Sequence, residues 1–329
     1  MDFVFILQQT IICMIPLLIV ALGGLFSERS GVINLALDGE MIFGAFIGAI
    51  FVWGMVQNNI GLATSQGVYF LGMLVAALSG AIFSLLLSFS AIHLKANQTI
   101  GGTSLNMLAP AIVCTFGLLF FNSERIVSGG SFILLKNSYP SWFQPVFDSW
   151  VGGFFSLLLD KVYLSTYVCV ILFIVLSVWL YRSKVGTHLR ACGEHPGAAA
   201  SVGINVKKMR YLGVSISGAL AGLGGFVYIA TSAATAAENT VAGLGFLALA
   251  IMIFGNWRPL WIALGAFLFG FLKCLGVLSS QIDFCSKLGL PMYFYNMMPY
   301  IVVIIVLVLV RKKSGCPKAE GIPYEEGQR

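Results

Sequence analysis

Long apolar runs follow one another through this chain, and they restrict it to folds that can cross a lipid bilayer. Hydrophobic residues make up 58% of its 329 residues and charged residues only 10%, against roughly 25% charged residues in a soluble domain. The runs approach the roughly 20 residues that a spanning helix needs, and they lack the alternation of a barrel strand. The sequence therefore predicts an all-α, polytopic membrane protein with one transmembrane domain covering residues 1–329.

About nine helices that cross the membrane fully or partly are expected from these runs. The first run, residues 3–25, has no basic residue before it and is long for a signal-peptide core, so we interpret it as a retained helix. The other predicted helices cover residues 33–55, 68–93, 105–121, 162–181, 211–230, 241–255, 260–279 and 292–310.

Residues 182–210 form a long hydrophilic connection that is rich in basic residues. Because positive charge concentrates in cytoplasmic loops, we place this connection in the cytoplasm, together with a tail at 311–329. Residues 122–161 then become an external loop, with an aromatic anchor at Trp142 and Trp150. The middle of 182–210 consists of small residues, which indicates a short helix lying close against another protein. A solvated connector that only fixes the topology is the alternative.

Two of the predicted helices depart from simple spans. Residues 241–255 are short and carry Gly243 and Gly245, and residues 105–121 are expected to be broken at Pro110. Transporters use short or glycine-interrupted helices to bring backbone groups to a site near the middle of the membrane. Ordinary helix packing through small residues is the alternative for most of the 37 glycines.

Asp38 and Glu40 lie inside an otherwise apolar run, where a charge costs on the order of 3 kcal/mol at the middle of the bilayer. If the helix begins near Gly31, Asp38 lies roughly 10 Å along its axis. Residues two apart on a helix project about 200° apart, so the two carboxylates are not expected to act as a pair. We expect one to brace neighbouring helices and the other to face a cavity. Asp38, with Asn34 and Asn106 as possible neighbours, is the candidate for the translocation pathway.

Several classes of function lack their motifs in this sequence. No GxxxxGK[ST] run is present to hold ATP phosphates, and no GxSxG run is present to hold a nucleophilic serine. The three histidines are not spaced like a zinc site. The basic residues lie beside apolar runs, which argues against nucleic acid as a partner. The seven cysteines contain no CxxC, so we expect small buried residues rather than disulfides or metal ligands.

Three separated stretches resemble one family of membrane proteins. Residues 27–46, SERSGVINLALDGEMIFGAF, resemble the opening motif of permease subunits in bacterial ABC importers for nucleosides and simple sugars, a broad family that also contains branched-chain amino acid permeases. Residues 190–205, RACGEHPGAAASVGIN, resemble the family's cytoplasmic loop, and residues 245–260, GFLALAIMIFGNWRPL, resemble its third recurrent stretch. The order of the three matches makes the resemblance specific for the family and less specific for the substrate.

The resemblance implies that the cytoplasmic loop seats in a groove of a separate ATPase subunit. The residues that match the family's coupling element are Arg190, Gly193, Glu194, Ala198, Ala199 and Gly203. It also places Asp38 at the acidic position of the first motif. Glu40 departs from the motif, which usually has an apolar residue at that position.

The same resemblance implies a transport subunit that is not itself an enzyme and holds no cofactor, because ATP and Mg are bound by the partner subunits. Its cargo would be nucleosides, with purine nucleosides favoured, and an external binding lipoprotein would deliver them. The translocation pathway would be shared with a second permease subunit, most simply as a heterodimer, in a bacterial cell membrane. A permease for ribose-type or galactose-type sugars is the first alternative. A secondary transporter driven by an ion gradient, with Asp38 as its ion site, and a membrane assembly factor remain the others.

Overall fold

The computed structural model describes residues 3–58, 66–127, 163–232, 236–279, 291–309 and 315–325. Nearly all of this structure is helical, as predicted. The helices are α1 (Phe3–Arg29), α2 (Leu37–Gln57), α3 (Gln66–Ile92), α4 (Gln98–Phe121), α7 (Leu164–Arg182), α8 (Lys184–Glu194), α9 (Pro196–Ser201), α10 (Val206–Thr231), α11 (Leu244–Phe254), α12 (Pro259–Leu278) and α14 (Met292–Leu309). Two short strands, β1 (Ile126–Val127) and β2 (Ala236–Ala237), pair antiparallel, with Ile126 opposite Ala237.

Seven of the described helices are long and apolar enough to cross a membrane, and two shorter apolar helices accompany them. This agrees with the expectation of about nine full or partial spans. The 11 residues of α11 correspond to about 16 Å at 1.5 Å per residue, roughly half of the 30 Å hydrocarbon core. α11 is therefore a partial span, and residues 241–255 do not cross the membrane as a helix.

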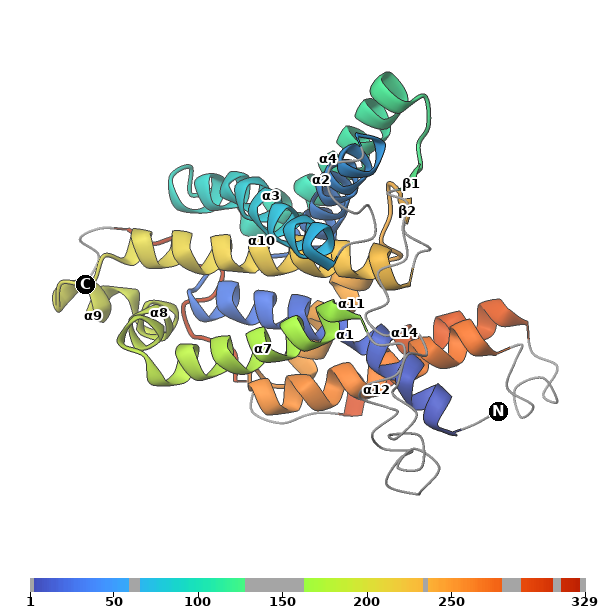
Figure 1. The fold of residues 1–329 in the computed structure, drawn as a ribbon. Coiled ribbons are helices and arrows are strands. Elements are labelled where there is room, and N and C mark those ends of the chain that lie inside the picture. The colour runs from blue at the N-terminus through green and yellow to red at the C-terminus, as the bar shows by residue number, and fades with distance from the viewer. Residues whose placement is uncertain are drawn as a thin grey trace, which may run out of the picture.

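The core is formed by α1 and α10, which run side by side through the middle of the molecule (Figure 1). About three quarters of each helix is buried, with 78% for α1 and 72% for α10 over their most apolar stretches. Close contact between helices depends on glycine, because a Cβ built at Gly44 of α2 would lie 2.3 Å from the Cα of Gly222 in α10. Small residues at such crossings let helix backbones approach in lipid.

The start of α2 differs from the prediction. Residues 30–36 are not helical, Gly31 has a φ of 93°, and the helix begins at Leu37 rather than near residue 33. The side chain of Asn34 accepts a hydrogen bond from the amide of Ala36 at 3.0 Å, which stabilises the turn in place of a helix. Asp38 consequently lies in the first turn of α2, and the expected position about 10 Å along a helix axis is wrong.

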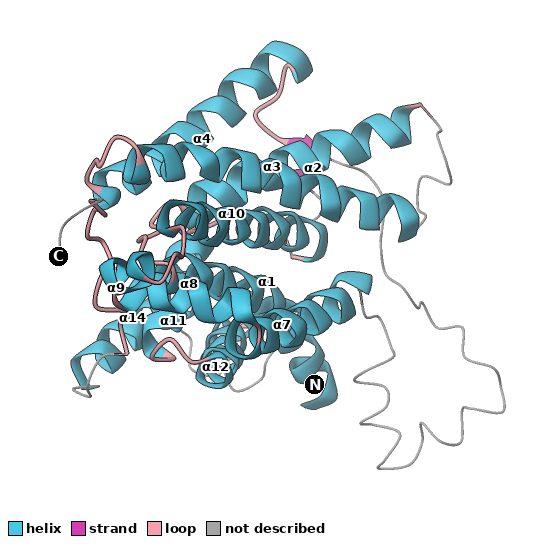
Figure 2. Ribbon diagram, turned by 90° about the vertical axis from the view of Figure 1, so that its left-hand side faces the viewer, coloured by secondary structure: helices cyan, strands magenta, loops and turns pink. Residues whose placement is uncertain are grey.

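The expected break in the fourth run is also wrong, because α4 continues through Pro110 from Gln98 to Phe121. The helix begins before residue 105 since the side chain of Asn97 accepts hydrogen bonds from the amides of Thr99 and Ile100. Proline removes only the hydrogen bond of its own nitrogen, and helices inside membranes tolerate this loss. α4 lies at the margin of the molecule in both views (Figures 1 and 2).

One end of the molecule carries α8 and α9, which together cover most of residues 182–210 (Figure 2). We refer to it as the cytoplasmic end, following the prediction from its basic residues. Residues 315–325 pack against the same end, through a hydrogen bond from the amide of Ala319 to the carbonyl of Gly193. The aromatic anchor expected at Trp142 and Trp150 lies outside the described residues.

Candidate functional site

α8 lies directly on the end of α1. Ser183 caps the N-terminus of α8, and its hydroxyl accepts a hydrogen bond from the amide of Gly186 at 2.9 Å. Its buried face contains Leu189, Cys192 and Gly193. A Cβ at Gly193 would lie 2.3 Å from the carbonyl oxygen of Arg29. Glycine at this position therefore allows α8 to contact the backbone of the first membrane helix.

α9 begins at Pro196, immediately after α8, and His195 joins the two helices. Ala199 is buried in a small cluster with Cys192 and Val206, whereas Ala198 is exposed. Gly203 follows α9 with a φ of 86°, in open space, and this backbone conformation favours glycine. The predicted coupling residues thus divide into packed positions and outward-facing positions.

Arg190 and Glu194 hold α8 to its neighbours rather than projecting freely. The guanidinium of Arg190 donates to the carbonyl of Tyr181 at 3.3 Å and lies 4.9 Å from the centre of the Tyr181 ring, a geometry that favours cation–π attraction. Glu194 pairs with Arg29 at 3.5 Å. Both contacts fix the orientation of α8 relative to the ends of α7 and α1.

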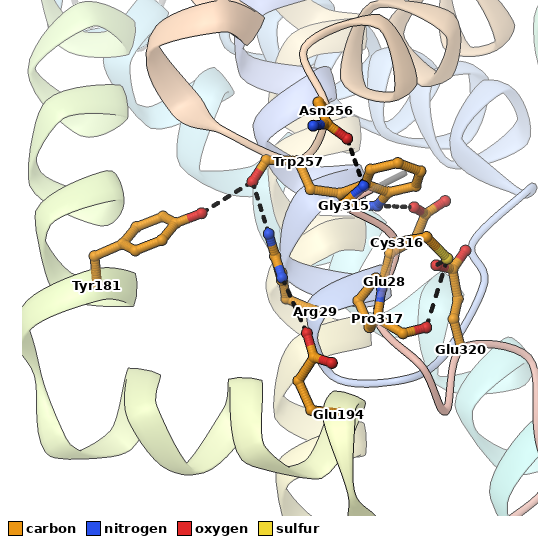
Figure 3. Close-up of polar contacts among 10 residues, drawn as sticks. All are labelled: Glu28, Arg29, Tyr181, Glu194, Asn256, Trp257, Gly315, Cys316, Pro317 and Glu320. Carbon is orange, nitrogen blue, oxygen red and sulfur yellow. Dashed lines mark hydrogen bonds and ion pairs between the residues drawn. The ribbon is translucent and has the colours of Figure 1, made fainter. Parts of the chain in front are cut away.

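Three elements meet at the backbone of Trp257, in the turn between α11 and α12 (Figure 3). Its carbonyl accepts hydrogen bonds from Arg29 at 3.1 Å and from the hydroxyl of Tyr181 at 2.9 Å. Asn256 and Trp257 both have positive φ, at 50° and 55°, a conformation that is uncommon for residues other than glycine. Because Arg29 also contacts Glu194, α1, α7, α8 and the turn after α11 form one connected polar group.

A second polar group, also drawn in Figure 3, is centred on two neighbouring carboxyl groups. The indole nitrogen of Trp257 donates to Glu28, which is 3% exposed, and the thiol of Cys316 donates to Glu320. Burial raises the pKa of Glu320, although hydrogen bonds from Cys316 and Glu28 and the charge of Arg29 oppose this change. Burial and the nearby carboxylates also raise the pKa of Cys316, to about 12.

Asp38 stabilises the start of α11. The amide of Gly245 donates to the Asp38 carboxylate at 2.8 Å, and α11 has no side-chain cap of its own. A carboxylate is favourable at a helix N-terminus, where free amides and the helix dipole meet it. Since α11 extends about 16 Å from this point to the cytoplasmic end, Asp38 lies about three helical turns from that end despite the late start of α2.

Asn34 and Glu40 form a separate, fully buried group. The amide of Asn34 donates to both carboxylate oxygens of Glu40, at 3.0 and 3.1 Å, and lies 2.9 Å from the hydroxyl of Ser217. Glu40 thus joins α2 to α10 through this amide. Asp38 and Glu40 have different partners, which agrees with the expectation that they do not act as a pair.

Asn106, from α4, contacts the backbone on both sides of Asp38. Its carbonyl oxygen accepts from the amide of Gly39 at 2.7 Å, and its amide donates to the carbonyl of Leu35 at 2.6 Å. Asn34 and Asp38 lie within residues 34–39, and Asn106 bonds to the backbone of the same segment. Neither asparagine bonds to the carboxylate of Asp38 among the described contacts. Only Asp38 and Asn106 are partly exposed; Asn34 is fully buried.

Comparison with protein families matches residues 6–309 to the permease component of the branched-chain amino acid transport system. The chain belongs to this permease family. Over 98% of its length, this permease is 37% identical to the guanosine ABC transporter permease protein NupQ of Bacillus subtilis, covering 97% of that protein. It is 33% identical to the nucleoside ABC transporter permease protein NupC of Lactococcus lactis, over 97% and 96% of the two chains.

A further relative is the putative glucose ABC transporter permease protein TsgC13 of Haloferax volcanii, 30% identical over 87% of this permease and 81% of that chain. No solved structure matches significantly. Family membership confirms the predicted recognition and makes this permease an integral membrane transport subunit.

Sequence reasoning missed the residues that hold the cytoplasmic end together. Glu28 and Arg29 lie inside the first quoted motif and Trp257 inside the third, so the motifs contained a signal for them. No sequence motif pointed to Glu320 or to the segment around it. Within the ranges that the structure describes, no group of three or more His, Cys, Asp and Glu side chains is placed to hold a metal ion.

Proposed function

We propose that this permease is the membrane-spanning subunit of an ABC importer for nucleosides, with purine nucleosides such as guanosine as preferred cargo. The observation that carries the proposal is the resemblance to NupQ and NupC along nearly the whole chain, since their names give guanosine and nucleosides as substrates. An external binding lipoprotein would deliver the nucleoside. The chain would bind neither ATP nor Mg.

The α8–α9 pair is the proposed docking element for a separate ATP-binding subunit. Ala198 and Gly203 face outward and have room for a partner, whereas Gly193 and Ala199 form the packed side of the same element. Arg190 and Glu194 tie α8 to α7 and α1. If the ATP-binding subunit binds α9 differently in the ATP-bound and ATP-free states, the change would therefore move α1 and the turn after α11. A partner shifts the permease between conformations only through such a difference in binding.

The proposed translocation pathway lies beside α4, at an interface with a second and related permease subunit. Only 22% of the apolar stretch of α4 is buried, and the helix presents Thr103, Ser104 and Thr115 on its exposed surface. Asp38 and Asn106 lie where α2, α4 and the start of α11 meet. A nucleoside needs hydrogen-bonding groups along its path, and these are polar groups that α4 and its neighbours offer within the membrane.

Reconstitution in proteoliposomes tests this proposal. We expect uptake of radiolabelled guanosine only when the second permease, the ATP-binding subunit, the binding lipoprotein and ATP are all present. Uptake that persists without ATP while a proton or sodium gradient is maintained would instead identify a secondary transporter.

A sugar importer is the second candidate, because TsgC13 shares 30% identity with this permease. Competition separates the two candidates. Excess unlabelled inosine should suppress guanosine uptake, and excess glucose or ribose should leave it unchanged. The opposite result would favour the sugar.

A further inference from the structure

Residues 315–325, which we refer to as the tail segment, follow a fixed path across the cytoplasmic end. The amide of Ala319 donates to the carbonyl of Gly193 in α8 at 2.9 Å, and the amide of Gly321 donates to the carbonyl of Gly31 at 3.3 Å. At its beginning, the amide of Gly315 donates to the side chain of Asn256. The tail segment is thereby bonded to α8, to the α1–α2 turn and to the α11–α12 turn.

Two cations contact the other half of the tail segment. Arg210, only 1% exposed at the start of α10, donates to the carbonyl of Ile322 at 3.0 Å. Within the described part of the chain, this carbonyl is the one hydrogen-bond acceptor that the guanidinium reaches. Lys95, from the α3–α4 connection, pairs with Glu325 at 2.9 Å. An unpaired guanidinium is costly to bury, so the tail segment stabilises the position of Arg210.

The tail segment packs against α9 at Tyr324. Tyr324 packs against the cluster of Cys192, Ala199 and Val206, which is the packed side of α9. Ile322, two residues earlier, is 56% exposed, and Val202, at the end of α9, is 74% exposed. The neighbouring ion pair of Lys95 and Glu325 is open to solvent, with both side chains more than 40% exposed.

These exposed apolar side chains are not explained by lipid. They lie at the end of the molecule that carries the charged residues, beyond the ends of the membrane helices, whereas the exposed leucines and phenylalanines of α3 and α4 lie within spans. Apolar surface left in water is unfavourable by about 25 cal/mol per Å². Apolar patches with a polar rim commonly mark protein interaction sites.

We propose that the tail segment is part of the docking surface for the ATP-binding subunit, with Ile322 contacting the same subunit as α9. This inference rests on the proposed function, since it extends the α8–α9 docking element. The ATP-binding subunit is the occupant that fits, because Tyr324 packs against the cluster that contains Ala199 of the proposed docking element, and Ile322 lies exposed two residues earlier in the tail segment. Through the bonds at Gly31 and Arg210, its movement would act directly on α2 and α10.

Site-specific photocrosslinking in the assembled complex tests the proposal. A benzoylphenylalanine is introduced separately at Ile322, at Ala198 and at Leu264, which is 52% exposed on α12 within the membrane. We expect crosslinks to the ATP-binding subunit from Ile322 and Ala198, and none from Leu264.

The outcomes separate the two proposals. Crosslinking from Ala198 without crosslinking from Ile322 overturns the role of the tail segment and leaves the docking of α9 intact. Crosslinking of Ile322 to the second permease or to lipid alone also overturns it. Absence of crosslinks from both positions, in a complex that purifies intact, contradicts the proposed function itself.

A binding measurement tests how much Ile322 contributes to the affinity for the ATP-binding subunit. Ile322→Asp should weaken binding of the purified ATP-binding subunit about tenfold, which corresponds to about 1.4 kcal/mol, whereas Ile322→Val should leave it nearly unchanged. The outward position of this side chain means that both variants should remain monodisperse in detergent. An Ile322→Asp variant with wild-type affinity would overturn the inference.

Discussion

The backbone amide of Gly245 and the carboxylate of Asp38 are joined by a 2.8 Å hydrogen bond, so a residue of α2 caps a helix that begins far later in the chain. A Cβ at Gly245 would lie 2.3 Å from the backbone nitrogen of Asp38. The partial span α11 is therefore positioned by the first turn of α2. Movement of either element at this point must move the other.

Two substitutions of Asp38 distinguish its role as the cap of α11 from the role of its negative charge. Asp38→Asn keeps an oxygen that can accept from Gly245, so we expect normal assembly, but guanosine uptake should fall because the charge beside the proposed pathway is lost. Asp38→Ala removes the cap as well and should cost about 1 kcal/mol of stability. Uptake assays and thermal unfolding in detergent measure the two effects. Wild-type uptake by Asp38→Asn would limit Asp38 to its structural role.

Substitution of Gly193 tests the contact between α8 and α1. Gly193→Ala places a methyl group against the carbonyl of Arg29, and we expect a loss of about 1–3 kcal/mol, as for other overpacked sites. Gly54→Ala is the matched control, since nothing lies within 4 Å of a Cβ at that position. Melting temperatures of the purified variants report the difference. Equal melting temperatures would mean that α8 is not held against α1.

Substitution of Ala198 tests the outward face of α9. Ala198→Trp adds a large side chain at an exposed position, so the protein should insert and purify normally while transport per ATP hydrolysed falls. Thr187→Trp, exposed on α8, serves as the control for bulk alone. The measurement is the ratio of guanosine transported to phosphate released in proteoliposomes. An unchanged ratio for Ala198→Trp would contradict docking through this face.

The position of the tail segment should depend on pH. Burial raises the pKa of Glu320, so the seated tail segment binds a proton more tightly than a released one. Seating is thus most favourable below the ordinary carboxyl pKa of 4.5, and it weakens as the pH rises through the raised pKa. Hydrogen exchange of the Ala319 and Gly321 amides should therefore accelerate as the pH rises through the raised pKa of Glu320, beyond the intrinsic dependence of exchange on pH.

Glu320→Gln is the control for this effect. The glutamine keeps the size of the side chain and does not titrate, so protection of the same two amides should lose the part of its additional pH dependence that comes from Glu320. A pH profile identical to that of the wild type would show that Glu320 does not govern seating of the tail segment.

Much of the membrane-embedded architecture was predictable, because length and continuity of apolar runs are properties of single segments. The start of α2 was not, since Val32, Ile33 and Leu35 continue the apolar run while the backbone turns. Hydropathy reports solvent preference and says nothing about φ and ψ. The break at Pro110 was wrong for a related reason, because a membrane helix can lose one hydrogen bond and remain continuous.

The candidate site was predictable only in part. Small residues and flanking charges indicated a short helix within 182–210, and α8 and α9 are found there. A cytoplasmic tail was predicted, but its packing against α8 and the α1–α2 turn was not, because the main contacts are made by the backbone amides of Ala319 and Gly321. Almost any residue supplies such an amide, so these contacts leave no signature in composition or spacing.

Seating of the tail segment over Arg210 also has a consequence for biogenesis. The ribosome completes α10 long before it synthesises residues 315–325, so this guanidinium emerges without the carbonyl of Ile322 that later accepts its hydrogen bond. The cytoplasmic end can reach its final form only after α14 has been inserted. A nascent chain that stalls earlier would carry an unfinished surface, which distinguishes immature molecules from those ready to assemble.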